Sequence, residues 1–233
     1  MKHIPRRAAC AIAACVVACA VFCAPFVALT DVSFAWHMVQ HLAVLFVLPL
    51  LLLLAEPFSW FGAVAGKRLT AIAVRAGKRL TIFASPPVAL AAFIAVLWWS
   101  HFSGLYEGAL DHLWIHAIEH SLFFAAGIIF WLPVLAPAPM RALAFPARLL
   151  YLLIALPQGA LLSAAIASAH APLYAHYAYG TTTAAAMADQ NAAASVMWIG
   201  GGAIVLAAFL GTLGVWAKRE RSHAISSGAP CAS

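Results

Sequence analysis

The sequence has little charge, and this scarcity excludes most soluble protein classes. Charged side chains make up 9% of the 233 residues and hydrophobic side chains 65%, against roughly 25% and 45–50% in soluble domains. A soluble domain of this length has no use for so much apolar surface, whereas a bundle of membrane helices does. The composition therefore predicts an all-α integral membrane protein.

Several functional motifs are also missing. The chain has no glycine-rich phosphate-binding loop, no nucleophile elbow and no cysteine pairs at zinc-finger spacing. Its net charge of +6 comes from short basic clusters between apolar runs. That placement is typical of membrane topology and not of a nucleic-acid-binding patch. We therefore expect a lipid bilayer around the protein and no nucleic-acid partner.

Six apolar segments have about the length that a helix needs to cross a bilayer. They cover about residues 8–29, 36–54, 86–103, 112–135, 149–169 and 195–216. A basic leader (1–7) precedes them, and a polar tail (217–233) that we expect to be disordered follows. All 13 lysines and arginines fall in the leader, in 55–85, in 136–148 or in the tail. The positive-inside rule then predicts six transmembrane helices with both termini cytoplasmic.

Histidine is concentrated at the outer ends of these segments. Eight of the ten histidines map to the non-cytoplasmic side of the membrane. The ends of four different spans should bring them to the same depth there. Histidines four residues apart lie on one helical face. The candidate metal ligands are His37, His41, His101, His112, His116 and His120.

Neutral imidazole binds copper, zinc, iron and haem, and ionisable groups inside a membrane mark a functional site by default. Four other residues at this level can orient or supplement such ligands: Glu119, Asp111, Asp189 and Met38. A thioether favours Cu(I). Alternative roles stay open: a hydrogen-bonded helix contact for His101, a helix N-cap for Asp189 and apolar packing for Met38.

The first segment carries three cysteines on one face: Cys15, Cys19 and Cys23. A thiol ladder can relay Cu(I), although small packing residues in an alanine-rich helix are the favoured interpretation. The basic start, apolar core and small residues around Cys19 also resemble a signal peptide, whose removal would leave five spans.

An ordered series of motifs resembles one family over about residues 36–220. The motifs are His37-Met38-Val39-Gln40-His41, Trp98-Trp99-Ser100-His101, Leu105-Tyr106-Glu107, His116-Ala117-Ile118-Glu119-His120, Trp131-Leu132-Pro133, Pro172-Leu173-Tyr174, Asp189-Gln190 and Met197-Trp198. Together they are similar to the polytopic CtaG-type cytochrome c oxidase assembly factors. Two positions depart from the family pattern, since Ser103 and Gly200 stand where proline is usual.

The resemblance implies a membrane chaperone that matures haem–copper oxidase by delivering copper to the catalytic subunit, without enzymatic turnover. It implies a bacterial inner membrane, a histidine cluster on the periplasmic side and a periplasmic copper donor as a further partner. Two alternatives use the same histidines. One is a membrane di-iron or zinc enzyme, and the other is a b-type haem protein with axial ligands from the second and fourth segments.

Overall fold

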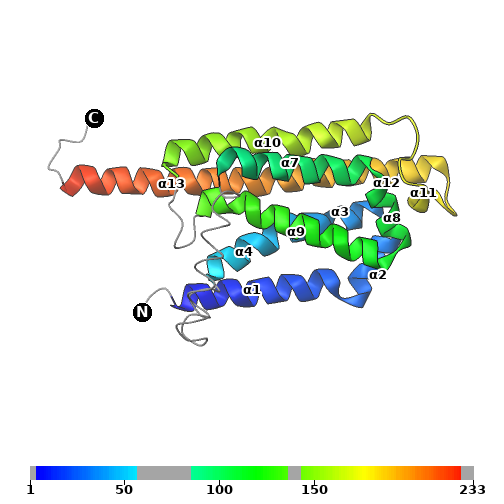
Figure 1. Ribbon diagram of the computed structural model, residues 1–233, viewed down its shortest axis with the longest axis horizontal. Coiled ribbons are helices and arrows are strands. Elements are labelled where there is room, and N and C mark those ends of the chain that lie inside the picture. The colour runs from blue at the N-terminus through cyan, green and yellow to red at the C-terminus, as the bar shows by residue number, and fades with distance from the viewer. Residues whose placement is uncertain (1–3, 57–84, 136–142, 227–233) are drawn as a thin grey trace.

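The computed structural model describes residues 4–56, 85–135 and 143–226, and every regular element in these ranges is a helix. Long helices lie side by side along one axis (Figure 1). Four segments are long and apolar enough to cross a membrane, or up to six if each of two bent pairs forms one span. The predicted all-α membrane bundle is confirmed.

The elements follow one another in this order: α1 (Ile4–Phe22), α2 (Ala24–Val32), α3 (Phe34–Leu42), the π-helical turn η1 (Ala43–Val47), α4 (Leu48–Ala55), α7 (Pro86–Phe102), α8 (Gly104–Asp111), α9 (Leu113–Leu135), α10 (Phe145–Ala167), α11 (Ala175–Ala178), α12 (Thr183–Val196), the π-helical turn η3 (Met197–Gly201) and α13 (Gly202–Ser226). α3, η1 and α4 form one continuous span, and α12, η3 and α13 form another.

Two predicted spans are bent. The first bends by 52° between α1 and α2, and the third continues beyond α7 into α8 after a bend of 65°. The sixth helix begins at Thr183 and not at residue 195, because Thr182 caps it by accepting from the Ala185 N–H at 3.2 Å. The alanine-rich stretch that follows has high helix propensity although it is less apolar than a typical span.

The expected disorder from residue 217 is wrong for residues 217–226, where α13 continues. The Trp216 indole donates to Glu220 Oε1 at 2.9 Å, one turn away. The Ser222 hydroxyl donates to the Lys218 carbonyl at 2.9 Å. Lysine, arginine and glutamate are strong helix formers, so the polar segment extends the helix past the apolar stretch. The rest of the predicted tail, 227–233, lies outside the described residues.

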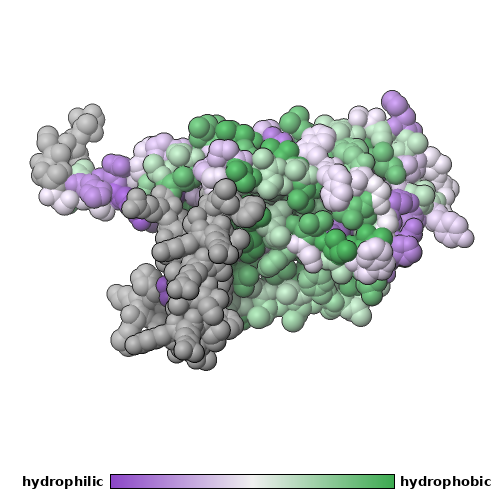
Figure 2. Space-filling view, in the orientation of Figure 1, coloured by the Kyte–Doolittle hydropathy of each residue, from purple (hydrophilic) through white to green (hydrophobic). Residues whose placement is uncertain are grey.

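The bundle has two different ends. α1 begins and α13 ends at one end, which we call the terminal end, while α2, α8 and α11 lie at the opposite, distal end (Figure 1). A hydrophobic surface covers the middle of the visible face, with hydrophilic residues towards both ends (Figure 2). The described lysines and arginines belong to helix segments at the terminal end: Arg6, Arg7, Arg148, Lys218, Arg219 and Arg221.

The α3–α4 span packs closely on α9 because a proline rearranges its backbone. Pro49 has no N–H, so the Leu45 carbonyl lacks its usual partner four residues on. Gly127 of α9 lies directly against this carbonyl, and a Cβ there would also come within 2.7 Å of Pro49 Cγ. The Phe46 carbonyl accepts from the Trp131 indole N–H at 2.9 Å. These contacts fix α9 beside the helix that carries His37.

The break between α1 and α2 is also tied to α3. The Val21 carbonyl would normally accept from residue 25, but Pro25 has no N–H. The Gln40 side-chain amide donates to this carbonyl instead, at 2.6 Å, and both residues are buried. Phe22 packs edge-on against the His120 ring, with centres 5.5 Å apart. The bend therefore closes one side of the region around His120.

Replacing Gly127 with alanine should destabilise the bundle by about 1–3 kcal/mol, because the added methyl overpacks the α4–α9 contact. Thermal unfolding in detergent micelles measures this loss. Gly211→Ala on α13 is the matched control, since a Cβ there meets nothing within 4 Å. Equal shifts in Tm for the two variants would contradict the described packing.

Replacing Gln40 with leucine should cost about 1–3 kcal/mol, because the Val21 carbonyl loses its donor in apolar surroundings. In a Pro25→Ala background, residue 25 supplies an N–H, so the same substitution should cost less. A double-mutant cycle measured by thermal unfolding tests this coupling. An unchanged cost in the Pro25→Ala background would show that Gln40 does not replace the missing backbone donor.

Candidate metal centre

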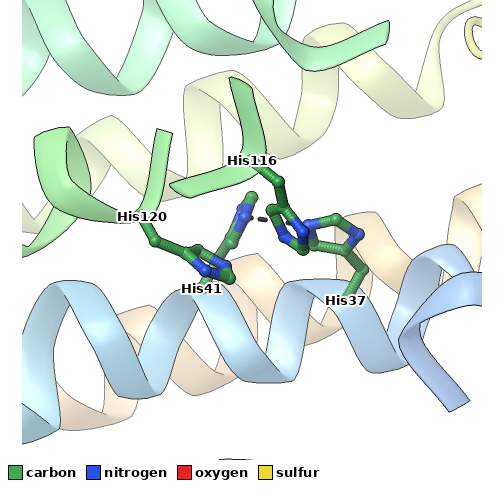
Figure 3. Close-up of side chains that lie close together, drawn as sticks. All are labelled: His37, His41, His116 and His120. Carbon is green, nitrogen blue, oxygen red and sulfur yellow. Dashed lines mark hydrogen bonds between the residues drawn. The ribbon is translucent and has the colours of Figure 1, made fainter. Parts of the chain in front are cut away.

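Two pairs of histidines face each other between α3 and α9. His37 and His41 lie one turn apart on α3, and His116 and His120 lie one turn apart on α9 (Figure 3). One ring nitrogen of each residue lies within 4.8 Å of those of the other three. We call these residues the four-histidine group. Each pair projects from one helical face, as its i, i+4 spacing requires.

The spacing of the rings suits a shared metal ion. The Nε2 atoms of His37 and His41 are 2.9 Å apart, and the ring centres of His116 and His120 are 4.2 Å apart. Imidazole nitrogens bind zinc at ~2.0–2.1 Å, so two nitrogens on one ion lie up to about 4 Å apart. For all four nitrogens to reach one ion, the widest pair would have to move closer by up to about 0.8 Å.

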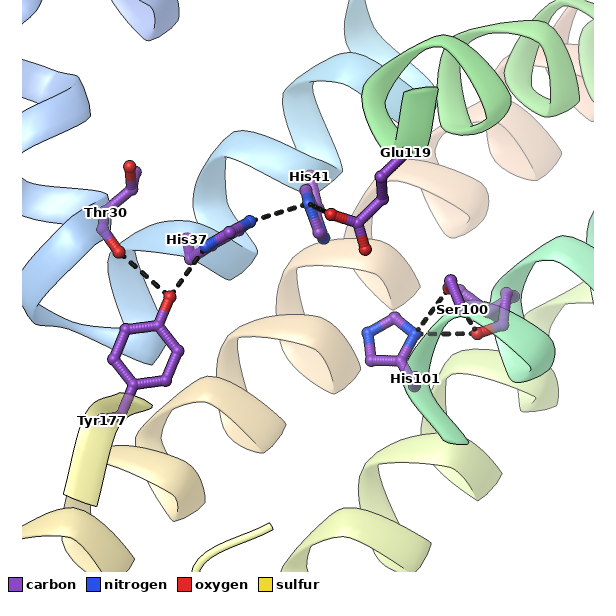
Figure 4. A network of polar contacts seen from close by, with 8 residues as sticks. Thr30, His37, His41, Ser100, His101, Glu119 and Tyr177 are labelled. Atoms are coloured by element: carbon purple, nitrogen blue, oxygen red, sulfur yellow. Dashed lines mark hydrogen bonds and ion pairs between the residues drawn. The ribbon is translucent and has the colours of Figure 1, made fainter. Parts of the chain in front are cut away.

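A tyrosine fixes the protonation of His37. The Tyr177 hydroxyl lies 2.7 Å from His37 Nδ1 and donates to the Thr30 carbonyl at 3.0 Å (Figure 4). Burial raises the pKa of Tyr177, so it keeps its proton. Because that proton goes to the carbonyl, the hydroxyl accepts from the Nδ1–H of His37. The lone pair of His37 is then on Nε2, which faces His41. Metal-binding histidines are commonly oriented by such a bond behind the ring.

The other three histidines hold nitrogens that no described residue satisfies. His41 Nδ1, His116 Nε2 and His120 Nε2 are all buried without a hydrogen-bond partner among the described residues. A buried polar atom left unpaired costs about 1–3 kcal/mol. A metal ion bound by the Nε2 atoms of His116 and His120 would offset that cost at these two residues, so they fit a soft or borderline cation.

Glu119 supplies a buried carboxylate beside the group. Glu119 is 0% exposed, and its Oε2 lies 3.6 Å from His41 Nε2. Neither carboxylate oxygen has a hydrogen-bond partner among the described residues. A buried carboxylate needs a compensating charge. A cation held by the four histidines would provide one.

Asp189 acts from a distance by capping α3. It lies inside α12, so it does not cap its own helix as the sequence had suggested. Its carboxylate accepts from the backbone N–H of Phe34 at 2.6 Å, from the Ser33 hydroxyl at 2.8 Å and from the Ala35 N–H at 3.3 Å. Negative charge at a helix N-terminus is favourable. Asp189 therefore fixes the start of the helix that carries His37.

Six candidates do not join the group. His112 is exposed at the turn between α8 and α9, in an extended conformation that removes it from the face of His116. Asp111 is exposed, and Met38 is fully buried in the apolar core. Cys15, Cys19 and Cys23 are exposed on α1 or at its end. Their sulfur atoms are not among the close ligand atoms of the four-histidine group.

His101 and several uncharged residues complete the surroundings. The His101 ring is buried with its centre 6.4 Å from that of His41. Tyr177 and Gln40 position parts of the site, yet neither was predicted to do so. Gln40 lies within the motif that includes His37, but no local pattern links Tyr177 to a residue 140 positions away.

A cavity of about 790 Å³ opens at the distal end next to the group. Tyr177 lines it, so the same side chain reaches both the cavity and His37. Its wall contains four acidic residues and, among the described residues, no lysine or arginine. The acids are Asp31, Glu107, Asp111 and Asp189. An acidic cleft attracts cations.

Fold and site together define a multi-pass α-helical membrane protein with a group of four histidines that could hold a metal ion. The family model of the cytochrome c oxidase caa3 assembly factor (Caa3_CtaG) matches residues 2–219, and the chain belongs to this family. The resemblance in its motifs is thereby confirmed. No curated protein and no solved structure matches the chain.

Replacing Tyr177 with phenylalanine should weaken Cu(I) binding by the group about 10–100-fold, because the His37 Nδ1–H loses its acceptor. Competition with a chromogenic Cu(I) chelator measures the affinity. Tyr179→Phe is the matched control, since Tyr179 is 92% exposed. Equal affinities in the two variants would argue against Tyr177 orienting a ligand.

Proposed function

We propose that this protein binds copper as Cu(I) through the four-histidine group and delivers it to the catalytic subunit of the oxidase that its family assembles. The observation that carries the proposal is the convergence of four imidazole nitrogens within 4.8 Å of one another. The family assignment connects that group to cytochrome c oxidase. A carrier requires reversible ligand exchange and no catalytic turnover.

The charge around the group supports a monovalent ion. Four neutral imidazoles add no charge, and Glu119 is the only acidic residue that is buried within the described ranges. Cu(I) and one carboxylate form a neutral set. A divalent zinc or iron ion would leave one uncompensated positive charge in the bundle, which is expensive to bury.

The packing of the rings favours a carrier over the two alternatives. Axial ligands of haem b lie on opposite faces of a flat macrocycle, which needs an open slot between them, whereas the rings that face each other across α3 and α9 lie close together: the centres of His37 and His116 are 5.1 Å apart, and those of His41 and His120 are 5.4 Å apart. Di-iron carboxylate proteins use several glutamates, whereas Glu119 is the single buried carboxylate near these histidines in the described part of the chain.

The cavity offers a route for loading. The basic residues at the terminal end favour a cytoplasmic position for that end, and in the proposed orientation the acidic cavity faces the periplasm of a bacterial inner membrane. Its four carboxylates would concentrate cations or attract a basic periplasmic copper donor. Tyr177 then lies between the cavity and His37.

Replacing His116 and His120 together with alanine should lower the copper content of the purified protein at least tenfold and reduce active oxidase in membranes. The matched control replaces His170 and His223, which are both exposed. Mass spectrometry of the metal, together with an absorption spectrum in detergent, provides the measurement. Wild-type copper content in the His116/His120 variant, or a Soret band, would reject the proposal.

A further inference from the structure

A second set of unpaired polar atoms lies beside the four-histidine group. The atoms that have no hydrogen-bond partner among the described residues are Nδ1 of His41, Nε2 of His101, both carboxylate oxygens of Glu119 and the hydroxyl of Tyr106. All four residues are at most 4% exposed, and they come from α3, α7, α9 and α8. Polar atoms that no residue satisfies are rare inside a membrane bundle, because no bulk water replaces the missing partner.

The hydrogen bonds of His101 determine which nitrogen is free. Its Nδ1 lies 2.8 Å from the Leu97 carbonyl, which can only accept. Nδ1 therefore carries the ring proton, and the lone pair is on Nε2. Figure 4 shows the His101 ring facing the space beside His41 and Glu119. A lone pair and a carboxylate beside the same space are both electron donors, so they call for a cation between them.

The spacing of the rings is compatible with one ion. The centres of the His41 and His101 rings are 6.4 Å apart. With bonds of ~2.0 Å and ring centres ~1.1 Å behind the nitrogen, two imidazoles on opposite sides of one ion have centres about 6 Å apart. The Tyr106 ring lies 5.7 Å from His101 and 5.9 Å from His41, centre to centre, and encloses the space.

We propose that His41, His101 and Glu119 form a second position for Cu(I), adjacent to the four-histidine group, and that the ion exchanges between the two positions. The inference rests on the proposed function. His41 is common to both positions, because its Nε2 contacts His37 while its Nδ1 is unpaired. A neutral imidazole has one lone pair, so His41 serves one position at a time and the protein holds one ion.

The two positions are distinguished by replacing the ligand residues of each one in turn. Cu(I) is added anaerobically to the purified full chain, and its affinity is measured by competition with a chromogenic chelator. The His116→Ala/His120→Ala variant, which should retain little copper on purification, should still take up one Cu(I) in this titration, at least tenfold more weakly than the wild type. Adding His101→Leu to this variant should weaken binding by a further tenfold or more, and by a larger factor than in the wild-type background.

Glu119→Gln keeps the side-chain volume and should likewise weaken Cu(I) binding more in the His116/His120 variant than in the wild type. It provides the test if His101→Leu does not fold. His170→Leu is the matched control for the number of histidines. The second position is rejected if His101→Leu and Glu119→Gln change nothing in the His116/His120 variant, which would mean that water satisfies the unpaired atoms. It is equally rejected if they weaken the wild type as strongly, which would mean a single site. Failure of the wild type to bind Cu(I) would instead reject the proposed function.

Discussion

Every backbone polar group inside a bilayer needs a partner from the chain itself, and this constraint governs how the bundle is built around α3. Asp189 caps the first turn of α3. Gln40 donates to the Val21 carbonyl that Pro25 leaves free, and the Trp131 indole donates to the Phe46 carbonyl in η1. Each contact joins α3 or its continuation to another helix. The span that carries His37 and His41 is therefore joined by side-chain hydrogen bonds to α12, α1 and α9.

The same constraint separates structural polar groups from functional ones. Two carbonyls that proline leaves without a backbone donor have a neighbour from another helix: Gln40 donates to the Val21 carbonyl, and Gly127 lies against the Leu45 carbonyl. Of the nine buried side-chain atoms without a hydrogen-bond partner among the described residues, two belong to Gln40 and Ser163. The other seven belong to His41, His101, Tyr106, His116, Glu119 and His120. Apolar packing would be cheaper than such a cluster. The presence of these unpaired atoms is explained if they coordinate a bound cation.

Much of this arrangement follows from local patterns, and the rest depends on contacts between distant residues. Long apolar runs indicated the helices, and i, i+4 spacing placed His37 with His41 and His116 with His120. The turn at His112 could not be read from helical periodicity, because the periodicity continues through residues where the chain bends. The role of Asp189 depends on α3, which lies 155 positions earlier in the chain, and hydropathy alone missed the alanine-rich start of α12.

The two halves of the four-histidine group differ in a way that suits binding followed by release. His37 and His41 are buried, with His37 held by Tyr177 and His41 beside Glu119. His116 and His120 are only partly buried, and the Nε2 of each is unpaired. Gly127 and Pro49 fix the α9 contact towards the terminal end, whereas the cavity lies at the distal end. A cation would thus meet two fixed ligands and two more accessible ones, and ligand exchange would begin on α9.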